Sequence, residues 1–203
     1  MKVKKHTSAA FAARRIAITG ILAALSTVLM MLSFNIPVVP SFLKFDLSEM
    51  PALLAAFAFG PIEGVLVCLI KNLINLPFTT TGGVGELSNF LLGASFTATA
   101  GIIYKIHTDR KGALLASLSG CLAMALLSVP INYFITYPVY TSFLPLEAIL
   151  GMYNAIIPGM NDLITCLWVF NAPFTFFKGL CDVAIVFLIY KRISPLLRGK
   201  ESR

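Results

Sequence analysis

The chain has 203 residues, of which 58% are hydrophobic and only 12% charged, and its mean hydropathy is +0.86. A soluble domain carries about a quarter of its residues as charged side chains, and apolar runs of about 20 residues, long enough to cross a bilayer, recur here. The net charge of +7 does not indicate nucleic-acid binding, because the basic residues flank the apolar runs instead of forming one face. We therefore expect one all-α polytopic membrane domain over residues 1–203.

The sequence shows no pattern of catalytic or metal-binding residues. The histidines, His6 and His107, lie outside the apolar runs and have no set of metal-binding partners. Nucleotide-binding and hydrolase motifs are absent. The cysteines lie in apolar runs without C-x-x-C spacing, which predicts small buried side chains: Cys68, Cys121, Cys166 and Cys181. We expect no enzyme, no metal site, no cofactor and no energy source within this chain.

The first predicted span covers residues 14–34 and follows a basic segment. Such a start resembles a signal peptide, but the run is too long and no A-x-A cleavage site follows it, so we expect a retained span. Small residues recur along one helical face of this span at Ala13, Ala17, Gly20 and Ala24. A face of small residues lets another helix approach closely in lipid, so it either packs inside the bundle or docks a partner protein.

A loop over residues 35–47 leads to a short helix over residues 48–59. Ser48 is expected to cap this helix, and Glu49 to lie in its first turn, where the helix dipole favours an anion. At about 18 Å the helix is too short to cross a bilayer alone. The loop before it should therefore dip into the protein, which is possible where the backbone lines a cavity.

Gly60 and Pro61 are expected to break the apolar segment into two helices, because glycine ends helices easily and proline disfavours helix at the residue before it. The second helix covers residues 61–76. Three further spans are predicted at residues 86–106, 113–138 and 173–192. Within them, we expect an interruption at Pro130 and a helix start at Asn171-Ala172-Pro173 with proline in the first turn, after a long connection over residues 141–171.

The basic residues predict the orientation. They gather before residue 16, in the turn at residues 105–111 and after residue 190. The positive-inside rule places all three segments in the cytoplasm. An even number of spans must then separate the N-terminus from the 105–111 turn, so residues 48–76 have to contribute two crossings. The total is six transmembrane helices with both termini cytoplasmic.

Polar residues within the last span form one stripe. Asn171, Thr175, Lys178 and Asp182 follow helical spacing on an otherwise apolar helix. Charged groups inside a membrane are costly and usually face a cavity or a partner. The stripe therefore contains either a Lys178–Asp182 pair with a capping Asn171, or a row of donors and acceptors that faces a cavity open to the outside.

Two other spans carry polar groups at a similar level. Asn132 either bonds a neighbouring helix or faces the same cavity, and Lys71 either faces it or pairs with Asp46, Glu49 or Glu86. Aromatic residues surround this level at Phe42, Phe45, Phe78, Tyr133, Tyr140 and Trp168. An outward-facing pocket of this kind suits a flat heterocycle that bears hydroxyl groups, although periodicity alone names no ligand.

Five motifs carry a family resemblance. They are K-F-D-L-S-E-M-P at Lys44–Pro51, F-G-P-x-x-G at Phe59–Gly64, K-N-L-I-N at Lys71–Asn75, I-N-Y-F at Ile131–Phe134 and P-F-x-x-x-K-G at Pro173–Gly179. With these motifs, nearly all of residues 12–195 resembles the substrate-binding S-components of energy-coupling factor (ECF) vitamin transporters, and most of all the riboflavin-specific ones.

The resemblance implies a six-helix fold that binds riboflavin, or its phosphate FMN, in the outer half of the membrane under the first outer loop. It implies main-chain contacts with the flavin ring around Leu43–Leu47, and side-chain hydrogen bonds from Asn132, Lys178 and position 175, where Thr175 replaces the asparagine of relatives. The ligand-binding residues expected in this way are Leu43, Phe45, Asp46, Leu47, Asn75, Asn132, Asn171, Thr175 and Lys178.

The resemblance also implies partners in a prokaryotic plasma membrane. The small-residue face of the first helix would dock a transmembrane coupling protein driven by two ATPase subunits, and transport would require the S-component to tip in the membrane. Two alternatives stay open: an S-component for another vitamin, and an intramembrane enzyme that uses Asp46, Glu49 or Glu86 as an acid or base.

Overall fold

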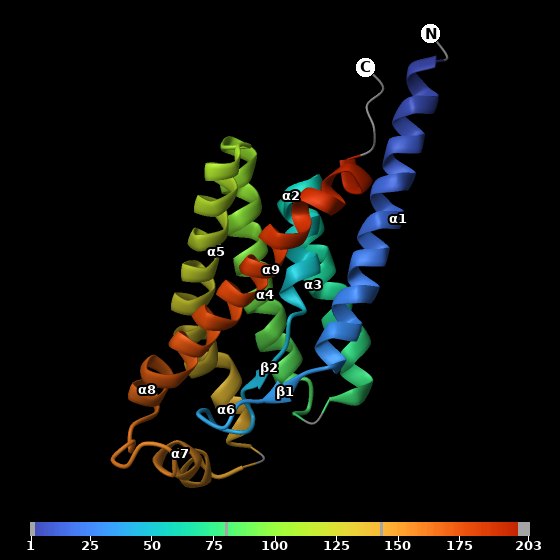
Figure 1. Ribbon diagram of the computed structural model, residues 1–203. Coiled ribbons are helices and arrows are strands. Elements are labelled where there is room, and N and C mark those ends of the chain that lie inside the picture. The colour runs from blue at the N-terminus through green and yellow to red at the C-terminus, as the bar shows by residue number, and fades with distance from the viewer. Residues whose placement is uncertain (1–2, 80, 143, 199–203) are drawn as a thin grey trace.

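Most long helices of the chain run roughly along one direction, and the last one crosses them obliquely (Figure 1), in a computed structural model that describes residues 3–79, 81–142 and 144–198. The elements in chain order are α1 (Val3–Met31), β1 (Phe34–Asn35), β2 (Lys44–Phe45), α2 (Glu49–Phe59), α3 (Pro61–Asn75), the 3₁₀ helix η1 (Leu76–Phe78), α4 (Val84–Ile106), α5 (Arg110–Ile131), the π-helix η2 (Asn132–Thr136), α6 (Tyr137–Tyr140), α7 (Leu146–Asn154), α8 (Leu163–Cys166), the π-helix η3 (Leu167–Asn171) and α9 (Ala172–Arg198).

Five helical runs in the described part of the chain are long and apolar enough to cross a membrane: Phe11–Met31, Pro61–Phe78, Val84–Ile106, Arg110–Tyr140 and Leu163–Ile189. The all-α membrane class is thus confirmed. Helix α2 has 11 residues and is too short to belong to this group. The count of six crossings therefore stays a prediction.

The predicted break between the second and third helices is confirmed. Gly60 adopts φ 119°, a conformation that glycine reaches at little cost, and Pro61 is the first residue of α3. The chain then folds back so closely that a Cβ on Gly64 would lie 2.8 Å from the Cβ atoms of both Ala56 and Thr97. This contact packs α3 tightly against α2 and α4.

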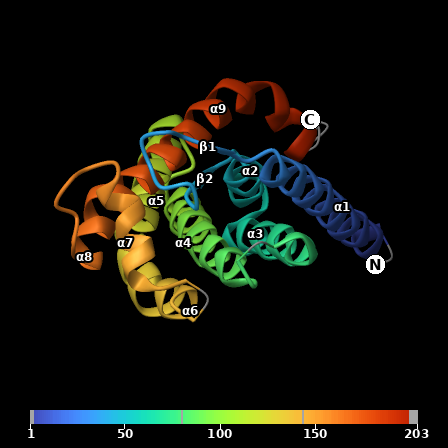
Figure 2. The ribbon, with the colours of Figure 1, turned by 90° about the horizontal axis from the view of Figure 1, so that it is seen from below.

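Helix α2 forms the centre of the bundle. Its residues 51–57 are all buried, and Ala52, Leu53, Leu54, Ala55 and Phe57 form a core cluster with apolar side chains of α1, α3, α4, α5 and α9. The view along the bundle shows α2 lying among α1, α3 and α9 (Figure 2). A helix that is apolar on every side is expected to be enclosed in this way.

The loop before α2 enters the protein, as expected from the shortness of that helix. Strands β1 and β2 form a two-residue antiparallel ladder that pairs Phe34 with Phe45. After this ladder, Asp46 and Ser48 are buried, and Ser26 on α1 donates a hydrogen bond to the Ser48 carbonyl oxygen. We call residues 36–48 the outer loop below.

The capping role predicted for Ser48 is wrong. Ser48 has helical φ and ψ, and its hydroxyl makes no cap hydrogen bond to the backbone. Its Oγ instead accepts a hydrogen bond from the buried ammonium group of Lys71. Competition from a buried cation therefore overrides the usual preference of serine for the helix end.

The last α-helix begins at Ala172, close to the predicted start, but the helical run that contains it begins earlier. A continuous helical run begins at Leu163, where the Asp162 carboxylate accepts a hydrogen bond of 3.0 Å from the Thr165 backbone N–H. Pro173 lies inside this run. Similarly, the fifth run passes through Pro130 to Tyr140 without ending.

The two π-helices explain how each run accommodates one of its prolines. Each π-helix ends two residues before a proline, at Pro138 and Pro173. Proline lacks a backbone N–H and its ring clashes with the carbonyl group four residues earlier. A wider turn relieves that clash, and single π-turns of this kind are frequent at functional sites.

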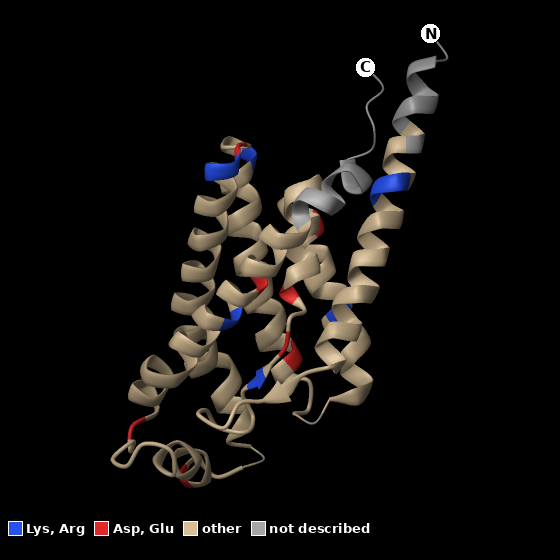
Figure 3. Cartoon of the chain, in the orientation of Figure 1, with Lys and Arg blue, Asp and Glu red and all other residues tan. Residues whose placement is uncertain are grey.

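The ends of the bundle differ in charge. The start of α1, the α4–α5 turn and the end of α9 lie at one end (Figure 1), and lysine and arginine residues mark that turn (Figure 3). This arrangement agrees with the predicted even number of crossings between the N-terminus and the 105–111 turn. The basic residues before residue 9 and after residue 189 lie outside the part whose side chains are described.

Candidate functional site

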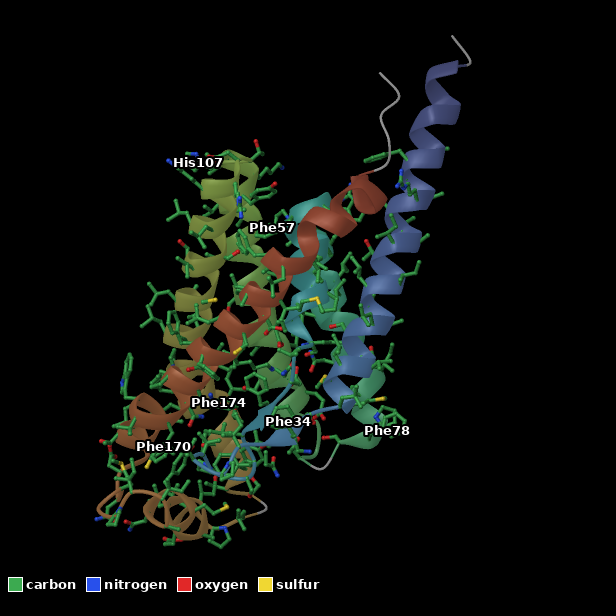
Figure 4. All side chains as sticks on the ribbon, in the orientation of Figure 1. Phe34, Phe57, Phe78, His107, Phe170 and Phe174 are labelled. Atoms are coloured by element: carbon green, nitrogen blue, oxygen red, sulfur yellow. The ribbon has the colours of Figure 1, made fainter. Side chains whose placement is uncertain are left out.

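A cavity of about 480 Å³ lies at the end of the bundle away from the α4–α5 turn. Two of its lining residues, Phe78 and Phe174, lie toward the end opposite His107 (Figure 4). The outer loop, α1, α2, α3, α4, η2, α6, η3 and α9 all contribute to its wall. Segments far apart in the sequence therefore converge on one site.

Most of the residues expected to bind a ligand line this cavity: Leu43, Asp46, Asn75, Asn132, Asn171, Thr175 and Lys178. Phe45 and Leu47 do not. The ring of Phe45 is buried and packs against Phe174 and Phe177, with ring centroids 6.3 Å apart in both pairs. Phe45 therefore fixes the outer loop to α9 without forming part of the cavity wall.

The expected aromatic surround is partly wrong. Phe42, Phe78 and Tyr140 line the cavity, whereas Tyr133 is 40% exposed and Trp168 is 51% exposed on the outside of the bundle. Both outward residues lie within a π-helix. Because a π-turn changes the helical spacing, regular 3.6-residue periodicity assigns such positions to the wrong face.

Several lining residues escaped the sequence reasoning. They are mainly Met30, Ser33, Thr81, Ser88, Asn89, Met124, Tyr137 and Phe174. Thr136, by contrast, lies four residues after Asn132 and lines the cavity with it, as helical spacing from that asparagine predicts. Tyr137 follows the π-helix, where that spacing no longer applies.

A buried ion network fixes the floor of the cavity. The Nζ atom of Lys178 lies 2.9 Å from Asp46 Oδ2 and 2.9 Å from Glu49 Oε2. Glu49 Oε1 in turn lies 2.6 Å from Lys71 Nζ. These four side chains are at most 8% exposed. Charges so deeply buried are tolerated only when paired, and this pairing joins the outer loop and α2 to both α3 and α9.

The network answers two questions left open by the sequence. The predicted alternative in which Lys71 pairs with a nearby carboxylate is confirmed, with Glu49 as the partner. The alternative Lys178–Asp182 pair is wrong, since Lys178 turns toward Asp46 and Glu49. Asp182 is fully buried, and within the described residues neither of its carboxylate oxygens has a hydrogen-bond partner.

Asn132 both lines the cavity and bonds neighbouring groups. Its Nδ2 donates to the Ser128 carbonyl oxygen at 2.7 Å, and its Oδ1 accepts from Ser88 Oγ on α4 at 3.4 Å. The two alternatives considered for this residue are therefore compatible. Because the Ser88 bond is long, the Oδ1 atom keeps capacity for a stronger donor.

Glu86 forms a negatively charged part of the cavity wall. Its carboxylate accepts hydrogen bonds from Asn75 Nδ2 at 3.1 Å, Thr79 Oγ1 at 2.6 Å and Thr81 Oγ1 at 3.2 Å. Its ionic charge has no counter-ion among the ion pairs of the described residues. The loop after α3 is thus organised around a carboxylate that is held by neutral donors.

The small-residue face of α1 is not used for packing within this chain. Ala13, Ala17, Gly20 and Ala24 are all exposed, and a Cβ on Gly20 would meet no atom of another described element within 4 Å. The alternative of ordinary bundle packing is therefore wrong. Helix α1 is held on its other side, where Arg15 Nε donates to Glu63 Oε1 of α3 at 2.7 Å.

The chemistry of the site is that of binding. Among the described residues, no group of three or more histidine, cysteine, aspartate or glutamate side chains is arranged to hold a metal ion. All four cysteines are free, and three of them are buried. The cavity instead offers amides, hydroxyl groups, carboxylates, ammonium groups and aromatic rings.

Comparisons with known proteins agree with this description. Residues 14–190 match the family model described as ECF transporter, substrate-specific component. The chain is 34% identical to the riboflavin transporter RibU of Staphylococcus aureus (strain TCH60), covering 91% of this chain and 93% of that protein. It is 29% identical to the riboflavin transporter FmnP of Bacillus subtilis (strain 168), covering 93% of this chain and 96% of that protein.

A solved structure supports the same conclusion. The chain superposes with a TM-score of 0.72 and 32% identity on a structure described as the S component of a bacterial ECF transporter, covering 92% of this chain and 99% of the other. These relatives are transporter components, which excludes the alternative of an intramembrane enzyme. With a membrane-embedded helical bundle and a family match over residues 14–190, the chain belongs to the substrate-specific components of ECF transporters.

Proposed function

We propose that the chain binds riboflavin in the cavity beneath the outer loop and delivers it for ATP-driven uptake by an ECF complex. The observation that carries this proposal is the cavity itself, which places Asn132, Thr175 and Lys178 around one space of about 480 Å³. Ligand pockets for small molecules typically measure about 300–1,000 Å³ and are mostly apolar with a few placed polar groups. A flavin ring with a hydroxylated chain fits that description.

The cavity wall divides into parts suited to the two ends of riboflavin. Phe42, Phe174 and Tyr140 provide aromatic surface for a ring system. Asn132, Thr175 and Lys178 provide donors and acceptors for polar atoms. The names of the relatives support this assignment, since both RibU of S. aureus and FmnP of B. subtilis are called riboflavin transporters.

The outer loop would close the cavity over the ligand. Leu43, Lys44 and Asp46 line it. Phe45 instead packs against α9, and Leu47 is half-buried outside the cavity wall. We propose main-chain contacts between Leu43–Leu47 and the flavin. The ion pair from Asp46 to Lys178 would hold the loop in the closed position.

Uptake requires partners, because this chain has no nucleotide-binding motif of its own. We propose that the exposed face formed by Ala13, Ala17, Gly20 and Ala24 docks the transmembrane coupling protein, which is driven by two ATPase subunits. Small side chains allow close helix contact in lipid. The binding unit would be a single membrane domain over residues 1–203.

The absorbance spectrum of the purified protein tests this proposal directly. Purified protein is expected to carry a yellow flavin, and added riboflavin should lose fluorescence as it stacks on the aromatic wall. Asn132→Ala should weaken binding relative to Tyr133→Phe, an exposed control on the same helix. A colourless protein with no fluorescence change at micromolar riboflavin would reject riboflavin as the ligand.

A further inference from the structure

A chain of three hydrogen-bonding groups leads from helix α7 toward the cavity. Tyr153 of α7 donates from its hydroxyl group to Asn171 Oδ1 at 2.7 Å, and the hydroxyl groups of Tyr137 and Tyr153 are also hydrogen-bonded. Tyr137 and Asn171 line the cavity, whereas Tyr153 does not. All three side chains are at most 2% exposed.

The number of hydroxyl hydrogens fixes the donor and the acceptor in each of these hydrogen bonds. A tyrosine hydroxyl has one hydrogen to donate. Because Tyr153 donates its hydrogen to Asn171, it can only accept from Tyr137, which is then the donor of that pair. Burial raises the pKa of the Tyr153 phenol, so this hydroxyl stays protonated and keeps its donor role.

The hydrogen bond from Tyr153 also fixes the orientation of the Asn171 amide. An asparagine amide is a donor at Nδ2 and an acceptor at Oδ1, and the hydrogen-bond network distinguishes them. Because Tyr153 donates to Oδ1, the Nδ2 atom of Asn171 points away from Tyr153. In the described part of the chain, Nδ2 has no acceptor. An unmade hydrogen bond in a buried site is costly, so a cavity-lining amide with a free donor indicates a partner that enters with the ligand.

We propose that Tyr153 is a positioning residue, which orients the Asn171 amide so that its Nδ2 donates to a hydrogen-bond acceptor of the bound ligand. This inference rests on the proposed riboflavin function, where the acceptor is a carbonyl oxygen or ring nitrogen of the flavin. Tyr153 acts from outside the cavity, and Asn171 is the group that touches the ligand. Helix α7 thereby contributes to ligand recognition without lining the cavity.

A purely structural role makes a different prediction. The ring of Tyr153 packs against Phe42 and Phe170, with centroids 5.6 and 5.1 Å apart. Tyr153→Phe keeps this packing and removes only the hydroxyl group. If the hydroxyl served only to attach α7, its loss would lower stability and leave the effect of an Asn171 substitution unchanged.

A double-mutant cycle separates the two roles. Riboflavin dissociation constants would be measured by flavin fluorescence quenching for wild type, Tyr153→Phe, Asn171→Ala and the double variant, with Tyr133→Phe as the matched control. We expect Tyr153→Phe to weaken binding about 2- to 10-fold, the range for loss of one neutral hydrogen bond. In the Asn171→Ala background the same change should have almost no further effect. The Tyr133→Phe control should bind like wild type, since Tyr133 lies outside the cavity wall.

Two results would overturn the inference. Equal effects of Tyr153→Phe in both backgrounds would make the hydroxyl independent of Asn171, and unchanged affinity of Tyr153→Phe would remove it from recognition. If Tyr153→Phe does not fold, Asn171→Asp decides instead: a carboxylate offers no donor, so it should bind no better than Asn171→Ala, and wild-type affinity would refute the donor role. Failure of wild type itself to bind riboflavin would reject the proposed function.

Discussion

Lys178 should matter both for the stability of the fold and for ligand affinity, and Lys178→Met tests the two separately. Its ammonium group is the shared counter-ion of Asp46 and Glu49, at 2.9 Å from each. Removing one partner of a buried ion pair costs about 3–5 kcal/mol, because the remaining charge is left buried without compensation. Glu49 keeps Lys71, so most of this cost should fall on Asp46.

The binding effect of the same variant is estimated independently. A hydrogen bond to a charged group contributes about 1.5–3 kcal/mol, and each 1.4 kcal/mol is tenfold in a dissociation constant. Lys178→Met should therefore weaken riboflavin binding roughly 10- to 150-fold. The control Lys105→Met removes an exposed lysine at the end of α4 that lies away from the cavity. It should change neither the stability nor the riboflavin affinity.

Thermal unfolding in detergent without flavin would measure stability, and fluorescence quenching would measure affinity. The double variant Asp46→Asn/Lys178→Met removes both charges and should be more stable than Lys178→Met alone, because position 46 then carries no unpaired carboxylate. Unfolding of Lys178→Met at the wild-type temperature would refute the buried pairing. Wild-type affinity for riboflavin would instead remove Lys178 from the ligand-binding wall.

Three further changes probe other parts of the molecule. Ala17→Trp should abolish flavin uptake in cells that supply the coupling and ATPase subunits, while riboflavin binding stays intact. The control Leu115→Trp lies on the exposed face of α5, across the bundle from α1 (Figure 2), and should leave both uptake and binding intact. Equal loss of binding and uptake in Ala17→Trp would mean that the small-residue face serves folding. Gly64→Ala should lower the free energy of unfolding by about 1–3 kcal/mol through overpacking. The control Gly151→Ala, with nothing within 4 Å of its added Cβ, should leave the free energy of unfolding unchanged. Equal unfolding temperatures of the two variants would contradict the tight α2–α3 contact. Glu86→Gln should strengthen the binding of FMN relative to riboflavin about 15-fold, since one unit charge at about 10 Å and a dielectric constant of ~20 contributes about 1.7 kcal/mol. An unchanged ratio of the two dissociation constants would show that this carboxylate does not face the phosphate.

The break at Gly60–Pro61 and the all-α membrane class were predictable because they depend on local signals. Glycine with a positive φ and proline at a helix start act within a few residues. The apolar runs and the basic turn at residues 105–111 likewise need no knowledge of distant contacts. These features position the helices, and most of the expected ligand-binding residues then fall on the cavity wall.

The errors share a physical origin in long-range contacts and altered helical spacing. Ser48 failed as a cap because Lys71, 23 positions later, takes its hydroxyl group. The partner of Lys178 lies 132 residues away at Asp46, whereas helical spacing favoured nearby Asp182. Tyr133 was misplaced because it lies within a π-helix, and Tyr137 was missed because it directly follows that π-helix, which alters the helical spacing.

The position of Lys178 makes the outer loop and the ligand interdependent. Its ammonium group has three donors, and two of them are directed at Asp46 of the loop and Glu49 of α2. A ligand that accepts the third donor binds a group already fixed by both carboxylates, so little side-chain freedom is lost on binding. Opening the loop removes Asp46 from this arrangement and leaves a buried cation with one carboxylate fewer. The ion network should therefore favour the closed loop, and a ligand bound at Lys178 should strengthen that preference.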